Sequence, residues 1–316
     1  METVMTLFGR SFTQYGLGCA AALLVGILVT GVCACRRGVP YARLIRTACL
    51  SVPLVLLFSR LVYVLANCTY YLTTLSRVDL ALCFWDGGYS LTGALLGFFL
   101  AVLLAGGKSC RSRLFDGMAV AMPAAVLVER LFEAGTGMGL GRAIQTQALR
   151  ELAFCCAEDL SGSSVHAVYR YEAVLAAVWL VVAVVLFCRR RHEGQLLAVM
   201  LTLLSCSQIL MESLRDDGHM VVHFVRIQQV LYAVFAAAAM GWFTRQGIRQ
   251  GLHGYWWKHL LMIACVGLCI FQEFRIDRSE NIWLDYGIMA VALAVMVAAV
   301  LLCRCRKEMP HGASGN

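Results

Sequence analysis

Residues 16–34 read GLGCAAALLVGILVTGVCA and contain no charged side chain. A helix of about 20 mostly apolar residues is long enough to cross the hydrocarbon core of a bilayer. A strand of a membrane β-barrel would instead alternate apolar and polar residues. This stretch therefore predicts a transmembrane α-helix.

Further apolar runs of similar length follow along the chain. We predict about nine membrane-spanning helices, at roughly 16–34, 48–66, 87–105, 115–133, 170–188, 195–214, 222–243, 259–273 and 283–303. The eighth run gives the weakest signal, because it is short and ends in Phe271-Gln272-Glu273. The fold class predicted is all-α, a polytopic transmembrane helix bundle.

The composition of the whole chain agrees with this class. Of its 316 residues, 60% are hydrophobic and 15% are charged, whereas soluble domains have about 45–50% apolar and about 25% charged residues. A soluble fold cannot hide so much apolar surface from water. The composition excludes a cytosolic enzyme, a secreted disulfide scaffold and a nucleic-acid-binding module, so no nucleic acid is expected as a partner.

Basic residues predict the orientation in the membrane. Cytoplasmic loops are enriched in Lys and Arg, and here basic clusters follow every odd-numbered run: Arg36, Arg37, Arg43 and Arg46; Lys108, Arg111 and Arg113; Arg189, Arg190 and Arg191; Arg245, Arg249 and Lys258; Arg304, Arg306 and Lys307. The N-terminus is therefore predicted outside and the C-terminus inside. The net charge of +8 reflects this bias and attraction to anionic lipids. No cleavable signal peptide is expected, because Arg36-Arg37 follow the first run instead of preceding it.

The 15 cysteines are scattered, mostly inside apolar runs, where a free thiol behaves as a small hydrophobic group. Their spacing does not match a zinc site, and no metal or cofactor is predicted. Four cysteines in outward loops either pair in an oxidising exterior or stay free, and the sequence leaves both open: Cys68, Cys83, Cys155 and Cys156.

Polar side chains gather in the outward halves of several predicted helices. They are Arg60 in the second; Glu129, Arg130 and Glu133 in the fourth; Tyr171 and Glu172 in the fifth; Gln208, Glu212 and Arg215 in the sixth; and Arg226, Gln228 and Gln229 in the seventh. Charges inside a bilayer are costly and mark functional sites. Any one of these charged side chains could instead extend to the lipid headgroups or be neutralised by a neighbouring side chain of opposite charge. Their convergence in one leaflet favours a phospholipid headgroup site, because the planar fork of arginine donates two hydrogen bonds to phosphate.

The third predicted helix opens with the glycine-rich sequence DGGYSLTGALLG at residues 86–97. Gly87 and Gly88 would let backbone N–H groups approach an anion at a helix N-terminus. Gly93 and Gly97 have the spacing of small residues that permit close helix packing. The sequence does not decide between an anion site and close helix packing as the explanation for these glycines.

Segments in this order resemble the bacterial phosphatidylglycerol–prolipoprotein diacylglyceryl transferase family over roughly residues 48–235. The segment from Arg60 to Val64 resembles the family's GxRxxYV, and Gly87 to Gly93 resembles GGxSFHG. Asp116 resembles an Asp before the family's fourth helix, and Glu129-Arg130-Leu131 resembles the segment around the arginine of GRxGNF. The segment from His166 to Glu172 resembles HPxQxYE, and Met211 to Asp216 resembles xEFxRxPD. Gln229 falls where the family has a glutamine in its seventh helix.

The chain departs from the family pattern at four positions. Thr92 stands where the family has histidine, and Glu133 where it has asparagine. Gln208 replaces an arginine and Leu204 a tyrosine in the sixth helix, whereas Arg130 is retained.

The resemblance implies a function in the bacterial cell membrane. The family transfers the diacylglyceryl group of phosphatidylglycerol to the cysteine thiol of a lipobox-containing prolipoprotein and releases glycerol phosphate. The nucleophile must be a thiolate, and fixed cations best stabilise the departing phosphate. We expect Arg130 to contact the phosphate, with Arg60 and Arg215 as helpers. The base is left open among Glu133, Glu129 and His166.

The expected site and domains follow from the same comparison. Arg130 and Glu133 are the predicted catalytic residues, and the predicted substrate-binding residues are Arg60, Tyr63, Gly87, Gly88, Ser90, Gly93, Glu129, His166, Tyr171, Glu172, Gln208, Glu212, Arg215 and Gln229. A seven-helix core is predicted over residues 1–247, with an outward loop at about 134–167. Residues 248–316 would add two helices and a short cytoplasmic tail.

Two other classes of function compete with the enzyme. Thr92 and Gln208 favour a non-catalytic phospholipid-binding or membrane scaffold protein that descends from such an enzyme. A transporter ranks lowest, because the sequence lacks an internal repeat with paired broken helices.

Overall fold

The structure is a computed structural model that describes residues 3–7, 10–74, 83–84, 87–189, 194–218, 220–222, 225–251, 253–276, 278–279 and 281–303. Arg190, Arg191, Arg304, Arg306 and Lys307, which contribute to the predicted orientation, lie outside these residues, as does Asp86. The chain divides into two compact units, Met1–Val234 and Phe235–Asn316.

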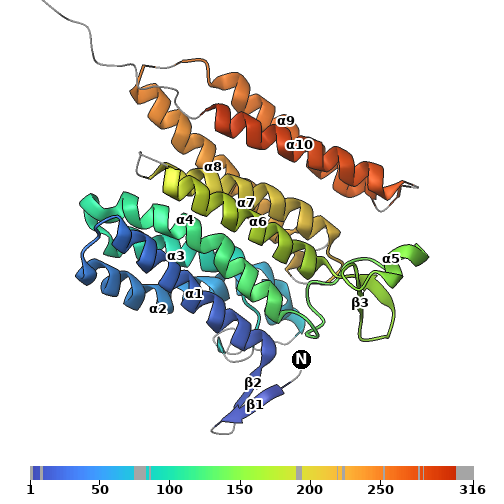
Figure 1. Cartoon of the computed structure of the whole chain (residues 1–316). Coiled ribbons are helices and arrows are strands. Elements are labelled where there is room, and N and C mark those ends of the chain that lie inside the picture. The colour runs from blue at the N-terminus through green and yellow to red at the C-terminus, as the bar shows by residue number, and fades with distance from the viewer. Residues whose placement is uncertain are drawn as a thin grey trace, which may run out of the picture. The chain divides into compact units, whose positions relative to one another are not determined.

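Every predicted membrane run contains a helix in the described part of the chain (Figure 1). The helices are α1 (Gln14–Arg36), α2 (Tyr41–Ala66), α3 (Leu91–Ala105), α4 (Gly107–Phe132), α6 (Val168–Arg189), α7 (Gln195–Leu214), α8 (Ile227–Arg249), α9 (Trp256–Ile276) and α10 (Ile282–Leu302). The helical membrane bundle is therefore confirmed. The weak eighth run proves to be a full helix, α9, of 21 residues.

The helices differ in how well they suit a membrane crossing. Seven of those in the described residues are long and apolar enough to span a bilayer, namely α1, α2, α6, α7, α8, α9 and α10. Helix α3 is apolar but has only 15 residues. Helix α4 has 26 residues and carries charges at both ends.

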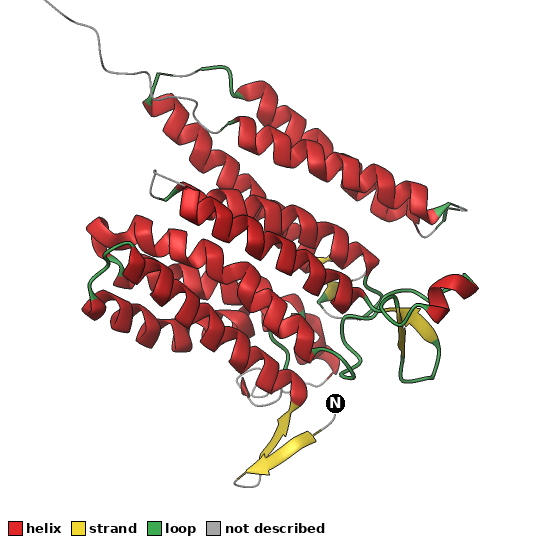
Figure 2. Cartoon of the chain, in the orientation of Figure 1, coloured by secondary structure: helices red, strands yellow, loops and turns green. Residues whose placement is uncertain are grey.

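Short antiparallel hairpins lie before the first helix and in two of the connections between helices (Figure 2). The hairpins pair β1 (Thr3–Leu7) with β2 (Arg10–Thr13), β3 (Cys156–Glu158) with β4 (Ser164–His166), and β5 (Val221–Val222) with β6 (Val225–Arg226). A π-helical turn, η1 (Tyr70–Thr74), follows α2, and a short helix, α5 (Gln147–Glu151), precedes β3. The loop predicted at about 134–167 thus contains α5 and the β3–β4 hairpin.

Helix α4 is the central element of the first unit, since it packs against α1, α3, α6 and α7. Its middle is almost fully buried, and a Cβ at Gly117 would lie 2.8 Å from the carbonyl oxygen of Thr30 in α1. Near its first turns, Asp116 accepts hydrogen bonds from the backbone N–H groups of Gly194 (2.8 Å) and Leu196 (3.2 Å). Asp116 thereby ties the start of α7 to α4, and the far end of α4 delivers Arg130 to the site.

Helices α2 and α3 approach each other closely through glycine. A Cβ at Gly93 would overlap the carbonyl oxygen of Phe58, and one at Gly97 would overlap that of Leu54. The structure therefore supports the packing explanation for these two glycines.

Replacing Gly97 by valine is expected to destabilise the protein by about 1–3 kcal/mol, because the added methyl groups force the α2 backbone to shift. The midpoint of thermal unfolding in detergent, followed by tryptophan fluorescence, measures the change. Gly267→Val is the matched control, since a Cβ at Gly267 meets nothing within 4 Å. Equal midpoints for the two variants would contradict the packing role.

Candidate functional site

Two arginines and three glutamates form one buried cluster, called the charge network here: Glu129, Arg130, Glu133, Glu172 and Arg215. Arg130 Nη1 lies 2.9 Å from Glu129 Oε2 and donates to Glu133 Oε1, and its Nε pairs with Glu172 Oε2. Arg215 Nη2 lies 3.2 Å from Glu133 Oε2, and its Nε lies 2.9 Å from Glu172 Oε1. Glu133 and Glu172 therefore each bridge both arginines.

The charge network is almost completely shielded. The exposed fractions are 3% for Arg130, 2% for Arg215, 1% for Glu133 and 0% for Glu172, and Glu129 at the edge is 12% exposed. Removing ions from water costs several kcal/mol each, and the cost is met only when every charge has well-placed partners. Because each bridging carboxylate serves both guanidinium groups, the geometry of the two arginines is fixed in advance.

Three helices place these side chains. Arg130 lies in the last turn of α4 and Glu133 is the residue that caps it, whereas Glu172 lies in the first turns of α6. Arg215 follows the last residue of α7 and has extended backbone angles. The structure thus brings together the predicted polar residues of the fourth, fifth and sixth runs.

One residue of the glycine-rich stretch at residues 134–141, AGTGMGLG, lies directly against the charge network. Gly139 has a φ of +67°, and a Cβ there would lie 2.7 Å from Glu133 Oε2 and 3.4 Å from Arg215 Nη2. Its N–H donates to Asp217 Oδ2 at 3.0 Å. Only glycine combines this backbone conformation with this close approach.

Asp217, which is not among the predicted site residues, also contacts the charge network. Its Oδ2 lies 3.8 Å from Arg215 Nη1, and its Oδ1 lies 3.9 Å from Arg226 Nη1. Arg226 also donates to the carbonyl oxygen of Arg215. The adjacent pair Asp216-Asp217 after a retained motif is the signal that would have pointed to it.

Arg60 has partners of a different kind. Its guanidinium donates to the carbonyl oxygens of Gly87 and Gly88, the latter at 3.1 Å. The carbon of that guanidinium lies 5.7 Å from the centre of the Tyr63 ring. Both glycines have positive φ, and a Cβ at Gly88 would overlap the Tyr63 ring. Arg60 and Tyr63 therefore hold the Gly87-Gly88 turn, whose carbonyl groups face a cation.

Ser90 begins α3. Its hydroxyl accepts a hydrogen bond from the N–H of Gly93 at 3.2 Å and lies 2.8 Å from the hydroxyl of Thr92. Its own N–H donates to the carbonyl oxygen of Ser59 at 3.1 Å. Ser90 thus caps the helix and joins it to α2.

Helix α7 and the start of α8 contribute buried amides and one more carboxylate. Gln208 and Glu212 are 2% and 1% exposed, and their Oε1 atoms accept no hydrogen bond from the described residues. Gln229 Nε2 donates to the carbonyl oxygen of Ile209 at 3.2 Å. A buried acceptor without a donor costs about 1–3 kcal/mol, so Gln208 and Glu212 suit a ligand that carries hydroxyl groups.

His166 and Tyr171 form a separate pair beside the β3–β4 hairpin. His166 Nδ1 lies 3.1 Å from the Tyr171 hydroxyl, which donates to the carbonyl oxygen of Cys155 at 3.3 Å. The four cysteines predicted to lie in outward loops are free thiols: Cys68, Cys83, Cys155 and Cys156. Among the residues that the structure describes, no group of three His, Cys, Asp or Glu is arranged to hold a metal.

Burial lowers the pKa of His166 below its usual value of 6.5. Between the two pKa values the unfolded chain binds more protons than the folded one, so stability falls as the pH falls through this window. His166→Gln is expected to remove that loss. Unfolding midpoints measured from pH 7.5 to 5 test it, and parallel pH profiles for the variant and the wild type would refute it.

Comparisons with known proteins agree over most of the chain. A family model described as prolipoprotein diacylglyceryl transferase matches residues 2–245. The phosphatidylglycerol–prolipoprotein diacylglyceryl transferase of Clostridioides difficile (strain 630) is 27% identical over 222 residues, which cover 70% of this chain and 85% of that protein. The protein of the same name from Symbiobacterium thermophilum is 27% identical over 250 residues, which cover 76% of this chain and 92% of that protein. The one from Halalkalibacterium halodurans is 23% identical over 262 residues, which cover 78% of this chain and 89% of that protein.

Proposed function

Because the chain belongs to the prolipoprotein diacylglyceryl transferase family, we propose that it transfers the diacylglyceryl group of phosphatidylglycerol to a prolipoprotein cysteine. It is a multi-pass protein of the bacterial cell membrane. The single observation that carries the proposal is the charge network, in which two buried arginines share two carboxylates. The family match and the relatives' names favour this function over a non-catalytic lipid-binding protein.

In the proposed reaction the cysteine thiol of a lipobox peptide loses its proton and attacks the glyceryl carbon next to the phosphate. A sulfur–carbon bond forms while the carbon–oxygen bond to the phosphate breaks. Glycerol phosphate leaves with the electron pair of that bond, and the proton lost by the thiol is balanced on its phosphate. Stabilising the charge on the departing phosphate is the main task of the site.

We assign the phosphate contact to Arg130, with Arg215 beside it. Glu133 and Glu172 are positioning residues in this proposal. Glu133 accepts hydrogen bonds from both guanidinium groups, and Glu172 accepts one from Arg215 and forms an ion pair with Arg130. A fork held from two sides loses little entropy when the phosphate arrives. The acceptor atoms of Gln208 and Glu212 would take the hydroxyl groups of the glycerol headgroup. We place the charge network at the outer leaflet, as the basic loops predict.

The test is a reaction with purified protein in phosphatidylglycerol vesicles and a synthetic lipobox peptide. Mass spectrometry is expected to show the peptide with a thioether-linked diacylglyceryl group. A peptide with serine in place of the cysteine is the control and should stay unmodified. Folded protein that gives no product, while a family enzyme works alongside, would overturn the proposal and favour the non-catalytic alternative.

A further inference from the structure

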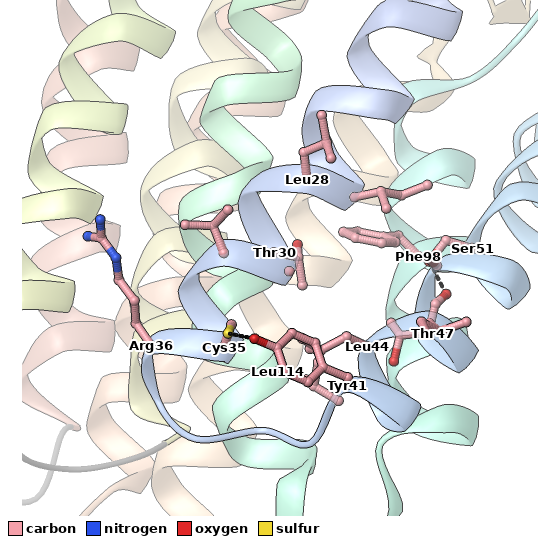
Figure 3. A pocket seen from close by; sticks show the side chains of 15 residues that line it. Leu28, Thr30, Cys35, Arg36, Tyr41, Leu44, Thr47, Ser51, Phe98 and Leu114 are labelled. Atoms are coloured by element: carbon pink, nitrogen blue, oxygen red, sulfur yellow. Dashed lines mark hydrogen bonds between the residues drawn. The ribbon is translucent and has the colours of Figure 1, made fainter.

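An apolar groove lies at the Arg36 end of α1, far from the charge network. Most of the residues that line it come from α1 and α2, and Phe98 of α3 and Leu114 of α4 line it too (Figure 3). Its volume is about 470 Å³. The other end of α1 adjoins the network, since Gln14 donates to the carbonyl oxygen of Ala134 at 3.0 Å. The 23 residues of α1 extend about 35 Å, so the groove and the network lie near opposite faces of the membrane.

The rim of the groove consists of exposed apolar side chains. Leu28, Val32 and Ile45 line it and are 56%, 55% and 63% exposed. These side chains face lipid in a membrane-spanning bundle. A cavity of this volume falls in the range of ligand sites, about 300–1,000 Å³. An apolar groove that opens sideways into the bilayer admits an acyl chain.

One polar group inside the groove lacks a partner. Thr30 lines the groove and is 2% exposed, and its hydroxyl makes no hydrogen bond with the described residues. Figure 3 shows it among the side chains around the cavity. A buried hydroxyl without a partner is costly. The ester carbonyl of a phospholipid is an acceptor that enters such a groove together with its acyl chain.

Arg36 lies at the edge of the groove, and its side chain extends away from Phe98 and Leu114 (Figure 3). The guanidinium of Arg36 is exposed and makes no hydrogen bond or ion pair within the described part of the chain. Neighbouring arginines are occupied: Arg37 donates to the carbonyl oxygen of Phe187 at 2.6 Å, and Arg43 to that of Ala105 at 3.1 Å. Arg36 lies at the end of a membrane helix, where a long cationic side chain reaches lipid phosphate.

We propose that this groove binds one anionic phospholipid from the leaflet at the Arg36 end of the bundle. One acyl chain fills the groove, Thr30 donates to an ester carbonyl, and Arg36 pairs with the headgroup phosphate. The site is distinct from the transfer site and takes a structural or regulatory lipid.

Photo-crosslinking in nanodiscs tests the proposal at the level of residues. The probe is phosphatidic acid with a diazirine on one acyl chain, and phosphatidylcholine with the same chain is the zwitterionic comparison. Peptide mass spectrometry is expected to find phosphatidic acid labelling concentrated in residues 27–51. Gly31→Leu should lower that labelling about tenfold, since a Cβ at Gly31 meets nothing within 4 Å and the side chain fills open space. Gly267→Leu, in a similarly open position of α9, should leave it unchanged.

Arg36→Gln should reduce labelling by phosphatidic acid to the level of phosphatidylcholine. If Gly31→Leu fails to fold, as size-exclusion chromatography reports, Ala48→Phe fills the same groove from α2. Labelling that spreads evenly over all lipid-facing helices, that survives both groove-filling variants, or that is equal for the two lipids would overturn the proposal.

Discussion

Replacing Arg130 by lysine is expected to slow diacylglyceryl transfer about 10²–10³-fold, the usual loss when one fixed donor to a developing anion is removed. Lysine keeps the positive charge but presents a single ammonium group. It cannot contact Glu129, Glu133 and Glu172 as the fork of Arg130 does and also donate two hydrogen bonds to phosphate. The loss should appear in the chemical step.

Single-turnover kinetics with phosphatidylglycerol vesicles and a lipobox peptide measure this loss. Arg46→Lys is the matched control, because Arg46 is exposed in α2 and the same change there should leave the rate unaltered. Size-exclusion chromatography confirms that both variants are folded. A folded Arg130→Lys protein that turns over as fast as the wild type would remove Arg130 from the proposed mechanism.

Replacing Glu172 by alanine is expected to destabilise the protein by about 3–5 kcal/mol, the cost of breaking a buried ion pair from one side. Glu172 is fully buried and pairs with both Arg130 and Arg215. Without it the two guanidinium groups share fewer anions inside the bundle. Denaturant unfolding in mixed micelles measures the free energy of unfolding.

A double-mutant cycle separates this pairing from lost packing. Arg215→Met removes one of the cations that Glu172 compensates. The double variant should therefore lose less free energy of unfolding than the sum of the losses of the two single variants. Glu158→Ala, at an exposed position of β3, should change stability little. Additive losses in the cycle would show that Glu172 and Arg215 do not depend on each other.

The fold was predictable because the lipid environment makes helix signals strong. A run such as 16–34 has one physical outcome, a helix whose backbone groups are all paired internally, and α1 confirms it. The predicted start of the third helix at residue 87 was less accurate, since α3 begins at Leu91. Gly87 and Gly88 belong instead to a turn with positive φ, which hydropathy does not encode.

The convergence of polar residues on one site was partly predictable. Arg130, Glu133, Glu172 and Arg215 meet because charges inside the bilayer must find one another, and the structure brings them into the charge network. Arg60 is likewise a charged residue inside a predicted membrane helix, but it donates hydrogen bonds to the carbonyl groups of a turn. Residue type alone does not distinguish a cation that awaits a ligand from one that caps a loop.

Other parts of the site depend on tertiary contacts that a single sequence does not reveal. Gly139 lies against Glu133 and Arg215 only because the loop at 134–141 folds back over α4. Asp217 reaches Arg226 across a short hairpin. The boundary predicted at residue 247 remains a prediction, since the compact units divide at Val234 and Phe235, within α8.

Release of the leaving group, glycerol phosphate, is the most direct test of whether Arg130 serves a transfer reaction. Vesicles with phosphatidylglycerol radiolabelled in its headgroup glycerol are mixed with wild-type protein or with Arg130→Lys, and soluble glycerol phosphate is counted against bound lipid. We expect release from the wild type only when the peptide carries its cysteine, in a one-to-one ratio with thioether formed, and very slow release from the variant. Wild-type protein that binds the lipid firmly yet frees no glycerol phosphate would contradict the claim that this buried arginine serves a transfer reaction.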